Sequence, residues 1–520
     1  MYNILTLVFS VITPLAHVGY ENGAVATDHP KASEAGVYLL KQGGNSVDAA
    51  IAASFALSVV RPHSCGLGGG GLALGFVENN AFALVGRETC PFSIDDDFIN
   101  NCTQDPHHSK YGARAIATPG FIQLMLSLHK EFGSLKLSQI LEPSIRLAEL
   151  GFEMDEEHCR GCDILKAKRE LVNSKTSHEN LWIWETFCHG GNYKKGAIVK
   201  QNNLSKTLKK ISTGNRMLID EILFEISKSI KKQDGFVSKD DVLQYQTQWT
   251  TPIVSNFWGG NLLLMPPPSS GGLVISQIIG TLNECNQIVN TDKHYLIESM
   301  KHGFASRANL ADDRFYPLNR KKLLDKLFWG ELSKKINPNQ TYSPEYYGKN
   351  NQIKDDSGTS HLCVADGFRN GVSITLTINT TYGSLIGSQS LGIVFNNEMD
   401  DFTTTNNNIN EYDLYQSLKN TPSPGKWPLS SMSPTIFLKD NKLKLLIGAS
   451  GGPHIISGVT QVILDILSNK MMPREAILEP RIHHQWLPNQ VLFESGYPKE
   501  LLLFLKKKGH ELKLAQGGIG

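Results

Sequence analysis

A threonine that follows a glycine is the first position in this sequence whose surroundings favour chemistry. In residues 355–362 (DDSGTSHL) a polar turn leads through Gly358 and Thr359 into an apolar run. A threonine hydroxyl attacks carbonyl groups once a base activates it, and a glycine leaves the preceding backbone deformable. Taken alone, Thr359 has a simpler interpretation as an ordinary strand residue, because threonine is frequent in strands. A nucleophile at Thr359 therefore needs support from other parts of the chain.

A second candidate is a glycine-rich turn that offers backbone N–H groups. Residues 449–454 (ASGGPH) follow an expected strand and precede an expected helix. Consecutive N–H groups in such a turn can form an oxyanion hole or an anion-binding nest. The alternative is a tight turn that binds nothing, and this segment alone leaves both open.

Other kinds of site are disfavoured by spacing. The glycines of 65–71 (CGLGGGG) precede a strand and lack the Lys-Ser/Thr of a phosphate-binding loop. His483 and His484 are adjacent and so point in different directions, and Cys159 and Cys162 have no second pair at zinc spacing. A local disulfide or two free thiols are both open for these cysteines. No G-x-S-x-G nucleophile turn occurs, and no metal or cofactor is expected.

The composition excludes several classes of protein. The 520 residues carry 51 Lys and Arg against 50 Asp and Glu, which gives a formal net charge of +1. Binding to nucleic acid or acidic membranes needs a basic surplus, so no nucleic-acid partner is expected. Apolar residues make up 40% and charged residues 19%, which is typical of neither a disordered chain nor a protein with many membrane spans.

The elements that must position these residues can be predicted from periodicity. Helical spacing of apolar residues predicts helices over 31–40, 46–60, 120–132, 137–150, 273–282 and 456–467. Short apolar and β-branched runs predict strands over 72–77, 81–85, 362–365, 372–378, 392–395, 435–438 and 443–447, the later ones as a packed antiparallel sheet. Residues 155–215 look irregular, and 403–428 is expected to be a long loop. Helices flanking β-layers predict an α+β layered sandwich.

The N-terminus has the pattern of a targeting segment. Residues 4–15 are mostly apolar and uncharged, too short for a membrane span, with small residues Ala16 and Gly19 as candidate cleavage sites. We expect a signal peptide over 1–19 and a secreted protein; a buried first strand or a membrane anchor with an extracellular catalytic part is the alternative. The candidate glycosylation sites are Asn101, Asn203 and Asn339, whereas the sequon at Asn379 is expected to be buried.

A series of motifs along the chain supports the hypothesis that Thr359 is a nucleophile. The motifs are 23–30 (GAVATDHP), 43–50 (GGNSVDAA), 65–70 (CGLGGG), 87–89 (RET), 118–120 (TPG), 265–272 (MPPPSSGG), 359–361 (TSH), 373–379 (SITLTIN), 396–402 (NNEMDDF), 428–434 (PLSSMSP) and 448–452 (GASGG). In this order they resemble the γ-glutamyltranspeptidase (glutathione hydrolase) family, and the resemblance covers residues 23 to about 510.

The resemblance implies a fold and an activation step. Members of this family are N-terminal-nucleophile hydrolases with a four-layer αββα core. Each is made as one precursor, which is cut into two chains that stay associated. Here the cut falls between Gly358 and Thr359, which gives a large subunit over 20–358 and a small subunit over 359–520. Thr359 then has a free α-amine that can serve as its base, and its β-branch limits the rotamers of the hydroxyl.

The resemblance also implies how a γ-glutamyl substrate is held. Three residues match the positions that bind the α-carboxylate of the substrate: Arg87, Ser430 and Ser431. Three others match the positions that bind its α-ammonium group: Asn379, Glu398 and Asp401.

The remaining matched positions belong to the reaction itself. Thr377 is implied to hydrogen-bond to Thr359 and orient it. Gly451 and Gly452 match the backbone donors of the oxyanion hole. Tyr412 falls in the segment that forms a lid in some members.

Three functions remain open at this stage. The first is an active hydrolase or transferase that cleaves the γ-glutamyl bond of glutathione and its conjugates and passes the group to water, an amino acid or a dipeptide. The second is a secreted homologue without turnover that acts as a binding or toxin-like factor. Its support is that the sequence stops at 517–520 without the further strand and Asp-Pro-Arg tail of the family, so it is partial or lacks a strand. The third, an acylase for other amides, is disfavoured by the α-amino and α-carboxylate positions.

We expect the chain to cut itself at the bond between Gly358 and Thr359. Thr359→Ala should leave one chain of about 500 residues after signal removal, because no hydroxyl is left to attack the bond. A denaturing gel should show two bands for the parent and one for the variant. Two bands from the variant would rule out Thr359 as the attacking residue.

Overall fold

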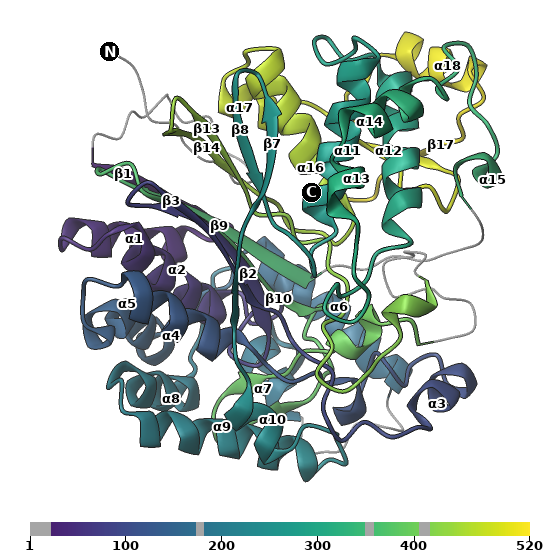
Figure 1. The fold of residues 1–520 in the computed structure, drawn as a ribbon. Coiled ribbons are helices and arrows are strands. Elements are labelled where there is room, and N and C mark those ends of the chain that lie inside the picture. Colours follow the sequence, from purple (N-terminus) through teal and green to yellow (C-terminus); the bar gives the residue numbers. More distant parts are fainter. Residues whose placement is uncertain (1–21, 173–180, 349–357, 405–416) are drawn as a thin grey trace.

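Two β-sheets lie face to face between outer layers of helices in the computed structural model (Figure 1). The structure describes residues 22–172, 181–348, 358–404 and 417–520. Strands β10 and β9 of the larger sheet contact β14 of the smaller sheet, and helices cover the outer face of each. This is the four-layer αββα sandwich that the family resemblance predicts, and it confirms the α+β class.

The larger sheet has six strands in the order β1-β9-β10-β2-β3-β6, all antiparallel to their neighbours. Their bounds are β1 Gly23–Thr27, β9 Gly358–Asp366, β10 Gly371–Asn379, β2 Gly70–Val77, β3 Asn80–Gly86 and β6 Gln248–Thr250. The two central strands β9 and β10 therefore carry the predicted nucleophile and the 373–379 motif side by side.

The smaller sheet has four antiparallel strands in the order β14-β13-β8-β7. Their bounds are β14 Lys442–Ile447, β13 Thr435–Lys439, β8 Gly260–Leu264 and β7 Ile253–Phe257. The strands predicted in the last third of the chain are therefore divided between the two sheets, except that Ile393–Val394 pairs with Gly387–Ser388 in a separate two-stranded sheet. Strand β14 leads directly into the 448–452 turn.

Period-2 alternation explains how β9 serves two cores at once. Leu362 and Val364 pack with the helices on the outer face of the larger sheet. Cys363 and Ala365 point to the other face and pack between the sheets. Successive side chains of a strand point to opposite faces, so the part of β9 that is covered on both sides, residues 362–365, is apolar at every position.

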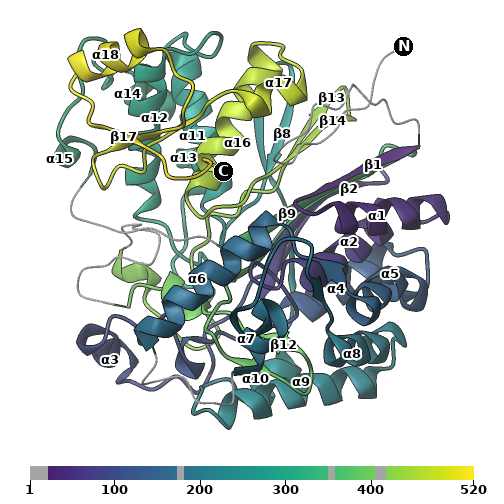
Figure 2. The same ribbon diagram turned by 180° about the vertical axis from the view of Figure 1, so that it is seen from behind.

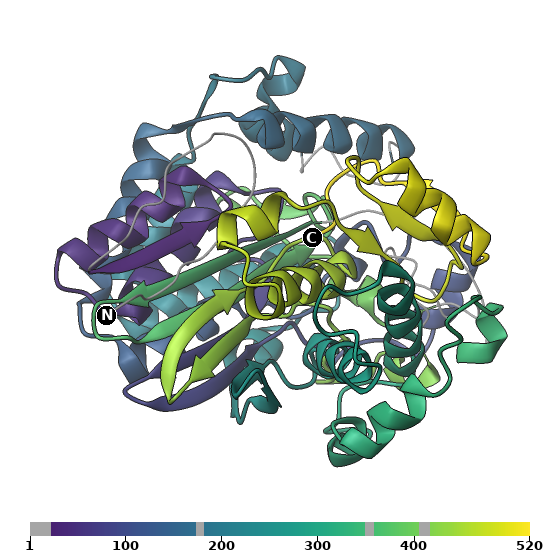
Figure 3. The ribbon, with the colours of Figure 1, turned by 90° about the horizontal axis from the view of Figure 1, so that it is seen from above.

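The outer layers are helices whose positions agree closely with the periodicity prediction. On the larger sheet they are α1 Pro30–Lys41, α2 Ser46–Val60, α4 Phe121–Phe132 and α5 Leu137–Leu150. On the smaller sheet, α11 Gly271–Glu284 packs against β7 and β8, and α16 His454–Ile463 packs against α11. All 15 residues of α2 are buried. Seen from above, the purple helices α1 and α2 and the teal helices that include α11 lie on opposite sides (Figure 3).

The prediction that residues 155–215 are irregular is wrong. They form α6 Glu156–Val172, α7 Leu181–Cys188 and α8 Asn202–Ser212 among the described residues, and α6 crosses the back of the molecule (Figure 2). Cys162 forms a disulfide with Cys188, which joins α6 to α7, and Cys159 is a free thiol. Neither local alternative for Cys159 and Cys162 holds, since the partner lies 26 residues away.

Shorter elements complete the described chain. The other helices are α3 Phe98–Gln104, α9 Arg216–Lys231, α10 Lys239–Gln244, α12 Lys293–Arg307, α13 Arg320–Leu323, α14 Lys326–Ser333, α15 Pro344–Tyr347, α17 Pro473–Leu478 and α18 Lys499–Lys507. The other strands are β4 Phe152–Glu153, β5 Ile198–Val199, β11 Gly387–Ser388, β12 Ile393–Val394, β15 Ile482–His483, β16 Val491–Phe493 and β17 Leu512–Leu514.

The predicted targeting and glycosylation features are only partly described. The expected signal peptide over 1–19 lies outside the described residues. Within the part of the chain that is described, no helix combines the length and apolar character needed to span a bilayer. Asn339 is exposed, Asn101 and Asn203 are half-buried, and Asn379 is buried as expected.

Candidate active site

The predicted nucleophile lies at the start of a central strand, with Gly358 and Thr359 still joined. Antiparallel pairing of β9 and β10 places Thr377 directly opposite Thr359. The Thr377 hydroxyl donates to the carbonyl oxygen of Gly358 over 3.1 Å, and it accepts a hydrogen bond from the N–H of Asn379 over 2.7 Å. Thr377 therefore contacts the carbonyl of the bond that is predicted to be cut.

Two glycines allow the backbones around this bond to approach closely. A Cβ at Gly358 would lie 2.6 Å from the carbonyl carbon of Thr380, and one at Gly69 would lie 2.0 Å from the carbonyl oxygen of Thr377. Any larger residue at either position would push the nucleophile strand or its neighbour away. The glycine cluster 65–71 thus serves backbone packing against β10, which agrees with its lack of phosphate-loop residues.

A pocket of about 310 Å³ opens beside Thr359. It contains most of the residues that the sequence placed in the site, together with four that it did not. The predicted ones are Arg87, Thr359, Thr377, Asn379, Asp401, Ser430, Ser431 and Gly452, and the others are Arg307, Leu429, Met432 and Ile455. Segments from both halves of the chain therefore meet at one site.

Arg87 is buried in a cluster of carboxylates. Its Nη1 lies 2.6 Å from Glu398 Oε2 and 3.3 Å from Glu88 Oε2, and its Nη2 lies 2.5 Å from Asp401 Oδ2. Arg87, Glu88 and Glu398 are each 1% exposed or less. Arg87, which was predicted to bind the α-carboxylate, is therefore in direct contact with Glu398 and Asp401, which were predicted to bind the α-ammonium.

Burial and charge act against each other in this cluster. Burial opposes the charge of Arg87, but the carboxylates outweigh burial and raise the pKa of the guanidinium. Burial raises the pKa of Glu88 to about 7 against the opposing charge of Arg87. Burial also raises the pKa of Glu398, again against Arg87. Arg87 is therefore charged at neutral pH, and burial holds the pKa values of both glutamates above their ordinary range.

The serine pair is held by the proline-rich turn of residues 265–272. Ser270 donates to the carbonyl oxygen of Ser430 through both its N–H, over 2.8 Å, and its hydroxyl, over 2.7 Å. The N–H of Ser430 donates to the carbonyl of Pro268 over 2.9 Å. This turn thus fixes the backbone of Ser430 and Ser431 at the pocket wall.

Arg307 is the charged pocket residue that sequence reasoning missed. It is the last residue of α12, and its Nη2 donates to the Ser431 hydroxyl over 3.2 Å. Twelve of the fifteen residues of α12 are buried, and they include other charged side chains. No local pattern in such a helix distinguishes a pocket arginine from a structural one.

The glycine-rich turn after β14 has the conformation of an anion-binding loop. Gly451 has φ of +107° and Gly452 has φ of +56°, which only glycine adopts readily. Neither N–H donates to a backbone carbonyl of the described residues. Gly452 lines the pocket, so its N–H is available at the site; Gly451 adjoins it along the turn.

Besides Gly451, three predicted residues are not at the pocket wall or cannot be placed. Glu398 contacts the pocket through Arg87, behind which it is buried. Gly358 precedes Thr359 in β9, and its carbonyl is the group that Thr377 contacts. Tyr412, the expected lid residue, lies outside the described residues.

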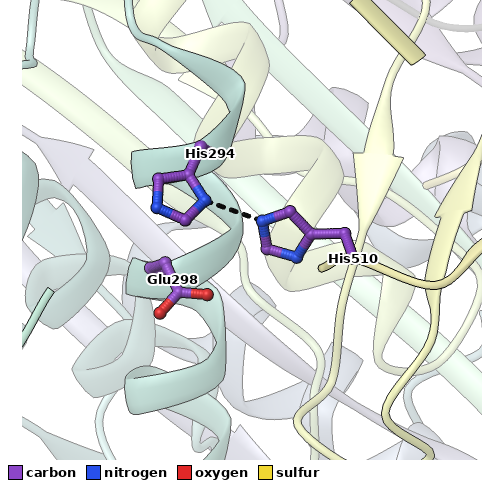
Figure 4. A group of neighbouring side chains, drawn as sticks. All are labelled: His294, Glu298 and His510. Atoms are coloured by element: carbon purple, nitrogen blue, oxygen red, sulfur yellow. Dashed lines mark hydrogen bonds between the residues drawn. The ribbon is translucent and has the colours of Figure 1, made fainter. Parts of the chain in front are cut away.

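One buried cluster elsewhere has side chains of the types that bind metal ions, namely His294, Glu298 and His510 (Figure 4). The His294 Nε2 donates to the carbonyl of Asn337 over 2.7 Å, so its Nδ1 is left to accept from His510 Nε2, also over 2.7 Å. Both oxygens of Glu298 accept hydrogen bonds from hydroxyl groups. Lys301 lies 3.4 Å from Glu298 and balances its charge. These contacts favour a structural network that joins α12 to the C-terminal segment.

A threonine that follows a glycine at the start of a central strand of an αββα sandwich is the arrangement expected of an N-terminal-nucleophile hydrolase. A structure of this class, cephalosporin acylase from Bacillus halodurans, matches with a TM-score of 0.84 and 25% identity over 98% of this chain and 92% of that one. The fold predicted from the sequence is therefore confirmed.

The family model described as gamma-glutamyltranspeptidase matches residues 32–520. Glutathione hydrolase 2 of Arabidopsis thaliana is 37% identical over 96% of this chain and 88% of its own length. The glutathione hydrolase proenzyme of Escherichia coli (strain K12) is 32% identical over 95% of this chain and 87% of its own length. The chain belongs to the γ-glutamyltranspeptidase family, which is a family of enzymes.

The raised pKa of Glu88 predicts a pH dependence of stability. Its pKa is about 7 in the folded chain, against 4.5 for an ordinary glutamate. Between these values the unfolded chain has lost the proton that the folded chain keeps, so stability falls as pH rises and levels off above about 7. In the parent, the free energy of unfolding should fall by about 1 to 3 kcal/mol between pH 5 and 8 because of Glu88, and Glu88→Gln should remove this fall.

The measurement is urea unfolding at several pH values, with Thr359→Ala as the background so that one uncut chain unfolds. Glu131→Gln, at an exposed carboxyl, is the control and should keep the full pH dependence. If the free energy of unfolding changes with pH equally in the Glu88→Gln chain and in the background chain, Glu88 is not the titrating group.

Proposed function

We propose that this chain is the precursor of a γ-glutamyl hydrolase and transferase that acts on glutathione and its conjugates. The observation that carries the proposal is one pocket in which Thr359 lies with Arg87, Asp401 and the Ser430–Ser431 pair. These groups match a small zwitterion attached to an amide, which is the form of a γ-glutamyl donor. Family membership and the names of the relatives support the same activity over a catalytically impaired binding protein.

Activation begins with attack of the Thr359 hydroxyl on the carbonyl carbon of Gly358. The peptide C–N bond breaks, the acyl group moves from nitrogen to oxygen, and water then hydrolyses the ester. The products are a carboxylate at Gly358 and a free α-amine at Thr359. The Thr377 hydroxyl supports this step, because it already donates to the oxygen on which negative charge develops. The large subunit over 20–358 and the small subunit over 359–520 stay associated through the shared sheet.

Turnover then uses the same hydroxyl on an external carbonyl. The α-amine of Thr359 takes the hydroxyl proton, the oxygen attacks the γ-carbonyl, and the Gly451 and Gly452 N–H groups stabilise the oxyanion. The α-amine of Thr359 then passes the proton to the nitrogen of the donor's amide, and that part of the donor leaves as an amine. A γ-glutamyl ester of Thr359 remains. Water, an amino acid or a dipeptide then takes the γ-glutamyl group and restores the free hydroxyl.

Recognition of the donor rests on its two charges. Asp401 and Asn379 line the pocket and offer acceptors to the α-ammonium, with Glu398 behind Arg87. Ser430, Ser431 and Arg87 offer donors to the α-carboxylate. Two opposite charges on one carbon are thus met by neighbouring groups of opposite sign.

We further propose that the protein is secreted after removal of residues 1–19, with membrane anchoring of an extracellular catalytic part as the alternative. The support is the apolar N-terminal segment. Of the candidate glycosylation sites, Asn339 is exposed and so accessible to a glycan, while Asn203 uses its amide to bond the carbonyl of Gln389.

Asp401→Ala should weaken turnover of γ-glutamyl donors. Removing one partner of a buried charge pair costs about 2–5 kcal/mol, which corresponds to roughly a 30- to several-thousand-fold loss in kcat/KM. The measurement is hydrolysis of a γ-glutamyl anilide by enzyme that has self-cleaved, which the variant should still do. Parent-like kcat/KM in the variant would favour an acylase for other amides.

Thr377→Val should slow self-cleavage, because it removes the hydroxyl that contacts the Gly358 carbonyl. Loss of one donor to an oxyanion costs about 100- to 1,000-fold in rate. The rate is followed on denaturing gels after a pulse of synthesis, and Thr377→Ser should restore most of it. A Val variant that cuts as fast as the parent would show that this hydrogen bond does not assist the reaction.

A further inference from the structure

Lys168 is a buried lysine of α6 that contacts the turn beside the bond to be cut. Its side chain is 5% exposed and lies outside the pocket. Its ammonium group donates to the hydroxyl of Thr380 over 3.1 Å and to the carbonyl oxygen of Thr381 over 3.2 Å. A buried ammonium is stable where oxygen atoms accept its hydrogen bonds, so these contacts hold Lys168 and the turn together.

The peptide bond between Thr380 and Thr381 is the one that packs against Gly358. A Cβ at Gly358 would lie 2.6 Å from the carbonyl carbon of Thr380 and 2.8 Å from the nitrogen of Thr381. Lys168 therefore binds both of the residues that this peptide bond joins. Because closely packed atoms transmit small shifts, a change in the Lys168 contacts is passed on to Gly358.

The backbone of this turn has a conformation that needs support. Asn379 has φ of +72° and Tyr382 has φ of +59°, and residues other than glycine adopt such values at a cost. Strained conformations persist where the surrounding contacts fix them. The N–H of Tyr382 donates to the carbonyl of His63 over 3.0 Å, and Lys168 holds the two residues between Asn379 and Tyr382.

The position of α6 is fixed at the same turn. The disulfide between Cys162 and Cys188 joins α6 to α7, and the Tyr382 hydroxyl lies 4.0 Å from the Sγ atom of each cysteine. Lys168 follows Cys162 in the same helix. The helix that carries Lys168 is therefore packed against the residue that ends the turn, which limits where the ammonium group can lie.

We infer that Lys168 is a positioning residue for self-cleavage: it holds the Thr380–Thr381 peptide against Gly358 and so keeps the Gly358 carbonyl at the Thr377 hydroxyl. The inference rests on the proposed self-cleavage and assigns a role in it to a residue outside the pocket. Lys168 forms and breaks no bond, since the Thr359 hydroxyl still attacks the Gly358 carbonyl carbon. Once the chain is cut, Gly358 no longer has to be aligned with Thr359, so Lys168 matters less for later turnover.

The first test compares self-cleavage with turnover in Lys168→Met. The variant should cut itself about 10- to 100-fold more slowly than the parent, because a displacement of about 1 Å at the reacting atoms is enough for such a loss. The rate is measured on denaturing gels after a pulse of synthesis. Chains that have been cut should hydrolyse a γ-glutamyl anilide with kcat/KM within about threefold of the parent. Lys166→Met makes the same change at an exposed position of α6 and should cut at the parent rate.

The second test changes the partner of Lys168. Thr380→Val removes the hydroxyl that accepts from Lys168 and should slow the cut, whereas Thr380→Ser keeps a hydroxyl and should restore most of the rate. A chain with both Lys168→Met and Thr380→Val should cut about as fast as the slower single variant, because both changes break one contact. A double variant whose loss is the product of the two single losses would show that the residues act independently and would reject the inference.

Two outcomes for Lys168→Met would also reject it. One is cleavage at the parent rate, and the other is an equal loss in cleavage and in kcat/KM, which indicates a general effect on the fold. If Lys168→Met does not fold, Thr380→Val decides the matter, and parent-like cleavage in that variant overturns the inference. A parent that remains one uncut chain would instead overturn the proposed function.

Discussion

Gly358 has almost no free space around its Cα, and the geometry of the site depends on this packing. A Cβ there would lie within 2.6 to 2.9 Å of backbone atoms of residues 379–381. Because these residues lie at the end of β10 and just after it, the tight fit sets the distance between the two central strands and brings the Thr377 hydroxyl to the Gly358 carbonyl. The bulge between Thr377 and Asn379, with φ of +72° at Asn379, turns the chain so that the Asn379 N–H supports Thr377. One close backbone contact thus positions Thr359, the peptide bond that precedes it and the Thr377 hydroxyl together.

The charged groups of the site form two sets because burial makes each unpaired charge costly. Three carboxylates surround the one cation Arg87, and burial raises the pKa of Glu398 above its ordinary range and the pKa of Glu88 to about 7. Around Arg307 serine hydroxyls replace carboxylates, and burial lowers the pKa of the guanidinium to about 10, with Asp401 opposing. Arg307 is still charged at neutral pH. The pocket therefore has an acidic and a basic side before any substrate enters.

Periodicity predicted the elements whose burial is uniform along one face, and motifs predicted most of the pocket. It failed for α6 because that helix carries charges on most turns and is fixed by a disulfide to Cys188, which lies 26 residues away in the sequence. It also gave no indication of Arg307, whose partners Ser270 and Ser431 are 37 and 124 residues away. The contact between Arg87 and Asp401, 314 residues apart, was likewise invisible, since matched motifs give positions but not which of them touch.

Cutting the chain must itself change the pocket, given the proposed reaction. Hydrolysis leaves a new carboxylate at Gly358, in a strand position that is buried and faces Thr377 and the backbone of residues 379–381. A buried carboxylate without a cationic partner is unstable, so this new chain end gains by moving out toward water. The carbonyl position that it vacates lies next to the Thr359 hydroxyl, where an external γ-carbonyl must enter for the same hydroxyl to attack it. Departure of the Gly358 end therefore enlarges the pocket on the side where the substrate reacts.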